Sequence, residues 1–443
     1  MEHELNIRES DILCFYNNIK YYQVENHILV ISPDTANWIV IDSEKEKFML
    51  EKLRKGINIG EIINSLSCSD KKIFIKLLSK IFSREFAGIN KKIKPVEIDT
   101  SDLLCCYLTN ACNLRCPHCY MDAGIRVKSE LYLKDWIKVL RDFKYNGGKG
   151  VTFTGGEPLM NTDFYEIVKT AHDIGLIVTV LSNGSMFTDK LIHDLYKYID
   201  EIQISIDGVN NDMDSIFRGG NHFYSAIHTV ILFSNLGVKT SVATTLPFET
   251  ISEGIDYKYN QFVTYIQNKC NNKVTFRLTK KMLPGRNVSY SRVDNERYYQ
   301  SILKIEKSVD PNSDLENFIE DHNQYNLLLK NCGFGGLTIS STGNVYFCNR
   351  IHQLNSIGNV KKLPIKYFLD KGKYIKNRTS VDNIYPCKNC DMRYICGGMC
   401  RIDDSNFKGK PENCKKFEII CPPLKVETLK KKMVDSFLYY YNY

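Results

Sequence analysis

The chain has 443 residues, of which 43% are hydrophobic and 25% are charged. These proportions are ordinary for a folded protein of about two to four domains, and they exclude a disordered or fibrous chain. The formal net charge of +8 is a modest excess spread over many lysines, so solvation explains it better than nucleic-acid binding does.

Cysteine is the unusual residue, with 16 in the chain. A secreted, disulfide-stapled protein is normally short and begins with an apolar signal, whereas residues 1–10 (MEHELNIRES) are charged. We therefore expect metal-binding cysteines in a reducing cytoplasm. We expect no membrane association, because no apolar run is long enough to span a bilayer.

Residues 1–95 are expected to form a separate small α+β domain. Strand-forming runs at 21–24, 27–31 and 38–41 precede helical periodicity over 44–55, 59–65 and 71–86. This order is similar to that of small winged-helix domains that recognise peptides in peptide-modifying enzymes. The alternative is a packing domain that binds no ligand.

Residues 100–280 alternate strand and helix patterns, which predicts a parallel sheet with helical crossovers. Strands are expected at 103–108, 150–153, 176–181, 201–206, 238–244 and 273–278, with helices at 136–145, 164–172, 189–198, 224–236 and 255–267. The predicted fold class is α/β, a partial (β/α)6 TIM-like barrel. In such a barrel the carboxyl ends of the strands carry the chemistry.

The rest of the chain is expected to contain three further segments. Residues 281–330 are polar and are predicted to be a partly helical connector. Residues 331–421 are rich in glycine and cysteine, which is typical of a domain held together by metal more than by a core. Residues 422–443 are predicted to form a closing helix over 426–438.

Cys112, Cys116 and Cys119 form a CxxxCxxC motif in the loop after the first strand of the predicted sheet. Three thiolates cannot saturate a cluster of four irons, so one iron stays open for a small chelating molecule. The alternative is structural zinc, which prefers four ligands in paired CxxC spacing. The nearest fourth candidate for zinc is His118.

These cysteines, with Gly155-Gly156-Glu157-Pro158 about forty residues later, resemble the radical S-adenosylmethionine (SAM) superfamily. The resemblance implies a 4Fe-4S cluster whose open iron binds the amino and carboxylate groups of SAM. It also implies reductive cleavage of SAM to methionine and a 5′-deoxyadenosyl radical, which takes a hydrogen atom from the substrate.

The same resemblance implies a set of SAM contacts: Gly155, Gly156 and Glu157 for the amino group, Arg218 for the carboxylate, His118 near the adenine, and Ser182, Asn183, Ser205 and Asp207 at strand ends. Several of these residues have a plainer alternative. The glycines also suit an ordinary turn, Asp207 and Arg218 suit turn capping and a solvated charge, and His118 suits a spacer. The sequence identifies no general base.

A second cysteine pattern lies near the C-terminus. Its members are Cys332, Gly343 and Cys348 (C-x10-G-x4-C), then Cys387, Cys390, Cys396 and Cys400 (C-x2-C-x5-C-x3-C), with Cys414 beyond. The pattern resembles the SPASM extension of radical SAM enzymes, which binds two auxiliary 4Fe-4S clusters. The alternative for residues 387–400 is a zinc ribbon.

The SPASM resemblance implies a ligand set for each auxiliary cluster. Cys332, Cys348 and Cys400 would hold the first, and Cys387, Cys390, Cys396 and Cys414 would hold the second, with Cys421 as the rival of Cys414. No cysteine lies between Cys332 and Cys348. The first auxiliary cluster is therefore expected to have an open iron or to be completed by Cys421 or another residue.

Five cysteines fit no ligand spacing and are expected to pack as small apolar residues: Cys14, Cys68, Cys105, Cys106 and Cys270.

The sequence therefore predicts a radical SAM peptide maturase that forms a cross-link, preferably a thioether, in a ribosomally made precursor peptide. Its expected partners are that peptide with its leader segment and an electron donor such as flavodoxin or ferredoxin. Alternative enzymes are a sulfatase-maturing enzyme that makes formylglycine, a carbon-carbon cross-linking enzyme and a cofactor-biosynthesis enzyme. A zinc-stabilised interaction module is the alternative outside the enzymes.

Overall fold

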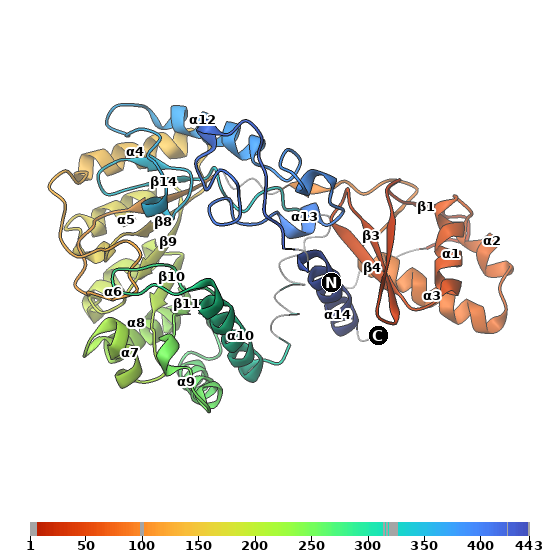
Figure 1. Ribbon diagram of the computed structural model, residues 1–443, viewed down its shortest axis with the longest axis horizontal. Helices are drawn as coiled ribbons and strands as arrows, with labels where there is room; N and C mark the ends of the chain where they lie inside the picture. The colour runs from red at the N-terminus through yellow and green to blue at the C-terminus, as the bar shows by residue number, and fades with distance from the viewer. Residues whose placement is uncertain are drawn as a thin grey trace. The chain divides into compact units, whose positions relative to one another are not determined.

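The computed structural model describes residues 7–97, 102–312, 327–422 and 424–441, together with Leu315 and Phe318 (Figure 1). The chain divides into two compact units. The first unit comprises Met1–Asp99, Asp314–Cys332 and Asn377–Tyr443, and the second comprises Thr100–Ser313 and Gly333–Lys376. Some residues of the expected boundary near residue 100, the connector and the C-terminal tail lie outside the described residues. They are 98–101, most of 313–326, and 442–443.

The second unit is built on an eight-stranded sheet in the order β12-β11-β10-β9-β8-β7-β14-β15. All neighbouring pairs from β12 to β14 are parallel, and β15 is antiparallel to β14. The strands are β7 (Leu103–Tyr107), β8 (Gly150–Thr154), β9 (Ile177–Ser182), β10 (Glu201–Ser205), β11 (Lys239–Thr244), β12 (Val274–Leu278), β14 (Leu337–Ile339) and β15 (Val345–Tyr346). The six parallel strands expected between 103 and 278 are confirmed.

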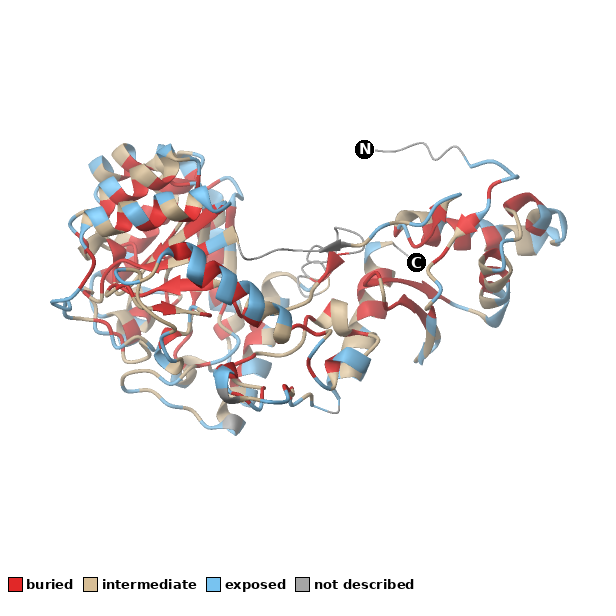
Figure 2. Cartoon of the chain, turned by 90° about the horizontal axis from the view of Figure 1, so that it is seen from above, coloured by how far each residue is buried: buried red, intermediate tan, exposed pale blue. Residues whose placement is uncertain are grey.

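Helices alternate with these strands along the chain and lie against the sheet (Figure 1). In α4, Trp136, Val139, Leu140 and Phe143 recur at helical spacing and are buried. Figure 2 shows the same division, with buried strands beneath helices whose outer faces are exposed. The helices of this unit are α4 (Leu133–Tyr145), α5 (Phe164–Asp173), α6 (Asp189–Leu195), α7 (Asn211–Arg218), α8 (His222–Asn235), α9 (Ile255–Lys269), α10 (Arg292–Val309) and α12 (Ile365–Arg378).

The helix α12 lies in the region 331–421, which was expected to be held together by metal more than by a core and for which no helix was predicted. Its buried residues are Ile365, Phe368, Leu369, Gly372 and Ile375. Their spacing is that of a helix with one apolar face, so the signal was present in the sequence. The neighbouring glycines and cysteines obscured it.

The first unit contains a three-stranded antiparallel sheet, β2-β3-β4, followed along the chain by three helices. Each helix begins after a side chain that accepts the backbone N–H of the third residue of the helix: Ser43, Asn58 and Ser67. The expected elements are confirmed as β2 (Lys20–Val24), β3 (His27–Ser32), β4 (Asn37–Ile41), α1 (Glu44–Arg54), α2 (Ile59–Asn64) and α3 (Cys68–Ser83). Short pairs add β1 (Leu13–Cys14) with β5 (Gly88–Ile89), and β6 (Val96–Glu97) with β13 (Leu327–Leu328).

The C-terminal helix α14 (Lys425–Tyr440) belongs to the same hydrophobic core as this sheet. The indole N–H of Trp38 on β4 donates to the carbonyl oxygen of Met433 at 3.1 Å. Val434 and Phe437 are also buried in this core, as is Ile395 of the short helix α13 (Arg393–Cys396). Residues 1–95 thus share a core with the end of the chain, although the sequence analysis treated them as a separate domain.

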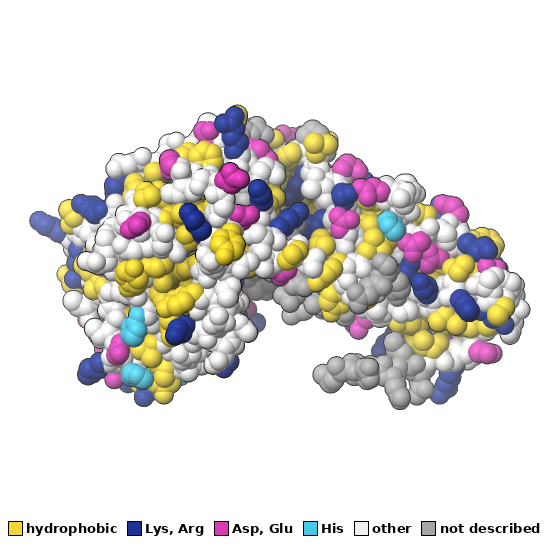
Figure 3. Space-filling view, turned by 90° about the horizontal axis from the view of Figure 1, so that it is seen from below, with side chains coloured by type: hydrophobic (Ala, Val, Ile, Leu, Met, Phe, Trp, Pro, Cys, Tyr) yellow, Lys and Arg dark blue, Asp and Glu magenta, His cyan; other side chains and the backbone are white. Residues whose placement is uncertain are grey.

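The surface carries a mixture of charges. On the face drawn in Figure 3, Lys and Arg side chains are scattered among acidic and uncharged ones. Among the described residues, no helix is both long enough and apolar enough to cross a membrane.

Candidate active site

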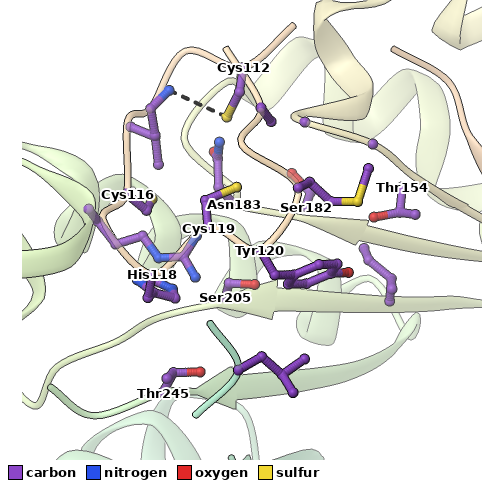
Figure 4. A pocket seen from close by; sticks show the side chains of 18 of the residues that line it. Cys112, Cys116, His118, Cys119, Tyr120, Thr154, Ser182, Asn183, Ser205 and Thr245 are labelled. Atoms are coloured by element: carbon purple, nitrogen blue, oxygen red, sulfur yellow. Dashed lines mark hydrogen bonds between the residues drawn. The ribbon is translucent and has the colours of Figure 1, made fainter. Parts of the chain in front are cut away.

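A cavity of about 380 Å³ lies in the second unit, at the carboxyl ends of the parallel strands (Figure 4). Cys112, Cys116 and Cys119 line it from the loop after β7. Ser182, Ser205 and Thr245 line it from the ends of β9, β10 and β11. The cavity is therefore where a parallel α/β sheet is expected to place its chemistry.

The cysteine loop is closed by its own backbone. The N–H of Cys112 donates to the carbonyl of Gly124 at 3.2 Å, and the N–H of Gly124 donates to the carbonyl of Asn110 at 2.8 Å. Within the loop, the N–H of Leu114 points at the sulfur of Cys112 at 3.4 Å, the dashed contact in Figure 4. These contacts fix the position of Cys112 at the start of the loop.

Arg286 holds this loop from a distant segment, and the sequence analysis did not identify it. Its guanidinium donates to the carbonyl of Cys116 at 3.0 Å and to the carboxylate of Asp122 at 2.5 Å. It also donates to the carbonyl of Ala123. Next to it, a Cβ on Gly285 would lie 2.4 Å from the carbonyl carbon of His118, so only glycine fits there. No local sequence pattern marks such a long-range contact.

Gly155 and Gly156 line the cavity, but their close approach is to the protein backbone. A Cβ on Gly155 would lie 2.5 Å from the carbonyl oxygen of Thr109, and one on Gly156 would lie 2.3 Å from that of Ala111. Gly155 also has a φ of +156°. The two glycines therefore allow the turn after β8 to pack against the segment that leads into Cys112.

Glu157 is completely buried and does not line the cavity. Its carboxylate accepts the hydroxyl of Ser182 and the backbone N–H of Asn183, each at 2.8 Å. Burial raises the pKa of Glu157 to about 7, although these hydrogen bonds oppose the rise. Its role in this structure is to position the end of β9, whose Ser182 and Asn183 do line the cavity.

Asp207 lies behind the cavity wall, and Arg218 and His118 lie on the cavity. Arg218 Nε donates to Asp207 Oδ2 at 2.5 Å, and His118 Nε2 lies 3.3 Å from the same oxygen. Burial raises the pKa of Asp207, but the charge of Arg218 and the contact with His118 outweigh it, so the pKa is lowered. The His118 ring stacks on Phe217 with ring centres 4.2 Å apart.

The structure therefore brings seven of the nine predicted SAM-contacting residues onto one cavity and places Glu157 and Asp207 directly behind it. Each buried carboxylate holds residues that line the cavity. Tyr120, which follows Cys119, also lines the cavity, although no sequence pattern marked it. Its hydroxyl lies 3.1 Å from that of Tyr107, which donates to the carbonyl of Asn349 at 2.7 Å.

The donor set fits an iron-sulfur cluster with one open iron. Burial raises the pKa of Cys116 to about 11 and also raises that of Cys112, so binding to a metal would supply the driving force for deprotonation. Among the described residues, no three His, Cys, Asp or Glu side chains stand close enough to hold a single metal ion. A four-iron cluster takes each thiolate on a different iron, so its ligands stand farther apart.

A second cavity, of about 280 Å³, lies in the first unit. Cys387, Cys390, Cys396 and Cys421 line it, whereas Cys414 does not. The predicted ligands of the other auxiliary cluster are divided between units, with Cys332 and Cys400 in the first and Cys348 in the second. Their shared cluster stays a prediction.

The five remaining cysteines do not all pack as expected. Cys106 and Cys270 are buried, and Cys14 and Cys105 are half-buried. Cys68 is exposed, because it is the first residue of α3, directly after the capping Ser67. The prediction that Cys68 packs as an apolar residue was therefore wrong.

Comparison with known proteins identifies two domains. A sequence model of the radical SAM superfamily matches residues 106–257, and one of SPASM, described as an iron-sulfur cluster-binding domain, matches residues 331–391. The chain is 33% identical over 141 residues to the sporulation killing factor maturation protein SkfB of Bacillus subtilis. That match covers 31% of this chain and 34% of SkfB, so it spans about a third of that relative.

Two further relatives match over longer stretches. The AdoMet-dependent heme synthase of Nitratidesulfovibrio vulgaris is 24% identical over 339 residues, which is 70% of this chain and 90% of that protein. The solved structure of native anSMEcpe with bound AdoMet (SAM) aligns with a TM-score of 0.54 at 17% identity, over 77% of this chain and 99% of that one. The structural match shows a shared fold.

Proposed function

Because the chain contains a radical SAM domain followed by a SPASM domain, we propose that it is a radical SAM peptide maturase. The enzyme cleaves SAM reductively and forms a cross-link in a ribosomally made precursor peptide. The observation that carries the proposal is the cavity on which three cysteines meet Arg218 and the polar ends of the strands. The partial similarity to SkfB, a maturation protein, favours a peptide substrate.

Cys112, Cys116 and Cys119 would hold the 4Fe-4S cluster, which when bound supplies the electron that cleaves SAM. Arg218 presents its guanidinium to the cavity, where it can pair with the carboxylate of SAM. Asp207 fixes the direction of that guanidinium.

The remaining wall can bind a nucleoside and limit the access of water. Ser205 and Thr245 bring hydroxyl groups to the cavity, and the ribose of SAM offers matching donors and acceptors. Asn183 is held by Asn113, whose side-chain oxygen accepts its amide at 2.9 Å, so it forms a rigid part of the wall. Apolar side chains, among them Leu181 and Met282, line the rest of the cavity and exclude water from the reacting atoms.

The finer assignments belong to the same proposal. The auxiliary cysteines would hold two more clusters, which accept the surplus electron as the cross-link closes, and a thioether is the preferred product. Flavodoxin or ferredoxin would supply the first electron. The domain formed by residues 1–95 would be a winged-helix-like domain that holds the leader segment, so that remote binding energy positions the reacting residue.

Anaerobic reconstitution tests the proposal. We expect about twelve irons per chain and release of 5′-deoxyadenosine with dithionite, and we expect Cys116→Ala to abolish that release. A candidate precursor peptide should lose two hydrogens and stay unreactive toward a carbonyl reagent, which would label formylglycine. Colourless protein with bound zinc and no cleavage of SAM would instead indicate the zinc-stabilised module.

The heme synthase relative supports a second candidate, a radical SAM enzyme of cofactor biosynthesis, because that match extends through most of both chains. The two candidates differ in substrate. Turnover of a tetrapyrrole precursor, with no modification of any peptide encoded beside the enzyme, would favour the second candidate.

A further inference from the structure

We infer that Cys421, and not Cys414, is the fourth sulfur ligand of the auxiliary cluster held by Cys387, Cys390 and Cys396. The inference rests on the proposed function, because it assumes that the SPASM domain binds iron-sulfur clusters. It departs from the ligand set that the SPASM resemblance implies for this sequence. The SPASM match ends at residue 391, so the closing ligand must be assigned from the chain itself.

The first observation is the cavity of about 280 Å³ in the first unit. Four cysteines line it, from the turn that begins at Cys387, from the end of α13 at Cys396, and from the segment before α14 at Cys421. Four sulfur donors around one cavity are what a 4Fe-4S cluster with no open iron requires. Cys414 is not part of the cavity wall.

Backbone pairing explains why Cys421 reaches this cavity. The N–H of Tyr385 donates to the carbonyl of Phe417 at 3.0 Å, and the N–H of Ile419 donates to the carbonyl of Tyr385 at 2.7 Å. Tyr385 lies two residues before Cys387, and Cys421 lies two residues after Ile419. The extended segment 417–421 therefore runs beside the Cys387 turn and brings Cys421 to the cavity.

Cys414 precedes the paired segment in the sequence and lies in a polar turn. Its thiol donates to the carbonyl of Lys416 at 3.0 Å and lies 3.7 Å from the side-chain oxygen of Asn406. The side-chain N–H of Asn406 donates to the same carbonyl of Lys416 at 2.9 Å. The side-chain oxygen of Asn406 accepts the backbone N–H of Glu418 at 3.1 Å. Moving Cys414 to the cavity would require this turn to be rebuilt.

Two cations on the cavity wall complement such a cluster. Arg393 and Lys425 both line the cavity, and Lys425 begins the helix that follows Cys421. Four thiolates give a 4Fe-4S cluster a net negative charge, which nearby cations stabilise. Val426 and Leu429 of α14 complete the wall with apolar groups.

The test uses the full-length, anaerobically reconstituted protein and the matched variants Cys421→Ala and Cys414→Ala. We expect Cys421→Ala to lose about four of about twelve irons and Cys414→Ala to keep all of them. Circular dichroism and SAM binding, which report on the fold and on the first cluster, should match the wild type in both variants.

Thiol alkylation gives a readout that needs no activity. In the loaded wild type, iodoacetamide followed by mass spectrometry should label Cys414 and spare Cys421, and removing the iron by chelation should make Cys421 reactive. Equal loss of iron in both variants, loss in Cys414→Ala alone, or labelling of Cys421 in the loaded protein would each overturn the inference. Wild-type protein that binds no iron would instead overturn the proposed function.

Discussion

The side chain of Glu157 is a polar group whose role is set by burial. The sequence suggested a carboxylate that meets the amino group of SAM, yet the structure directs it toward Ser182 and Asn183, behind the cavity. A carboxylate in that position organises the wall by accepting hydrogen bonds. Its ionisation then affects the stability of the fold as well as the site.

Glu157 predicts a specific pH dependence. Burial raises the pKa of this carboxyl to about 7 in the folded protein, from an ordinary value of 4.5. The folded state therefore binds the proton more tightly, so the contribution to stability is complete below pH 4.5 and is lost as the pH rises through 7.

Glu157→Gln does not titrate and provides the comparison. The free energy of unfolding of the wild type, relative to this variant, should fall by up to about 3 kcal/mol between pH 5 and pH 8. Urea denaturation across that pH range measures the difference. A difference that stays constant with pH would contradict the assignment.

The Arg286 side chain makes three hydrogen bonds to the loop that carries the cysteines. Its charged hydrogen bonds to the carbonyl of Cys116 and to Asp122 hold the start of the CxxC turn and the segment that follows the turn. We expect Arg286→Ala to lower the free energy of unfolding by about 1.5–3 kcal/mol and to reduce the iron retained after reconstitution.

The exposed Arg141 on α4 offers a matched control for that prediction, because Arg141→Ala removes the same side chain from the surface. Its effect on stability should stay within about 0.5 kcal/mol. If both variants retained iron equally, Arg286 would have no positioning role.

Among the helices and strands, α14 contributes both to the core of the first unit and to the wall of its cavity. One face packs in the core of the β2-β3-β4 sheet through Met433, Val434 and Phe437. Its first turns line the cavity that contains Cys421. A single helix therefore connects the N-terminal sheet with the auxiliary cysteines.

Met433→Ala should destabilise the first unit by about 2–5 kcal/mol, because it removes a fully buried side chain and leaves a cavity. The exposed Glu427 on the same helix forms an ion pair with Lys430 at 2.9 Å, so Glu427→Ala should cost at most about 1 kcal/mol. Guanidinium denaturation followed by circular dichroism compares the two. Equal effects would show that α14 does not belong to the core.

At the scale of the molecule, the two units have separate cores, and the N-terminal segment contributes to only one of them. The cavity that contains Cys112, Cys116 and Cys119 is lined entirely by residues of the second unit, and the cavity that contains Cys421 is lined entirely by residues of the first. Damage to one core should therefore spare the chemistry of the other unit.

Deletion of residues 1–97 tests this separation. Without β2, β3 and β4, the apolar face of α14 has no sheet to cover it, so the auxiliary cavity should be lost. We expect the truncated protein to bind about four fewer irons while it still releases 5′-deoxyadenosine with dithionite. Retention of the full iron content would show that the auxiliary site does not need the N-terminal sheet.

Short-range patterns in the sequence were enough to predict β7 to β12, the β2-β3-β4 sheet with its three helices, and the loop that carries Cys112, Cys116 and Cys119, but not α7 or α12. Strand alternation and helical periodicity are local, and the motif spacing is local too, so each can be seen without knowing the fold. The parallel direction of β7 to β12 followed from the alternation of strand and helix patterns along the chain. The carboxyl ends of parallel strands lie at the same edge of the sheet. The sequence therefore also predicted which residues at the strand ends would lie near the cysteines.

The tertiary structure alone decided which groups face the cavity and which lie behind it. Glu157 and Asp207 are buried, Arg286 reaches the cysteine loop from more than 160 residues away along the chain, and Cys421 replaces Cys414 at the second cavity. These outcomes depend on contacts between segments far apart in sequence. Such contacts produce no periodic pattern in the sequence of either segment, because the periodicity of a segment reflects only its own helix or strand.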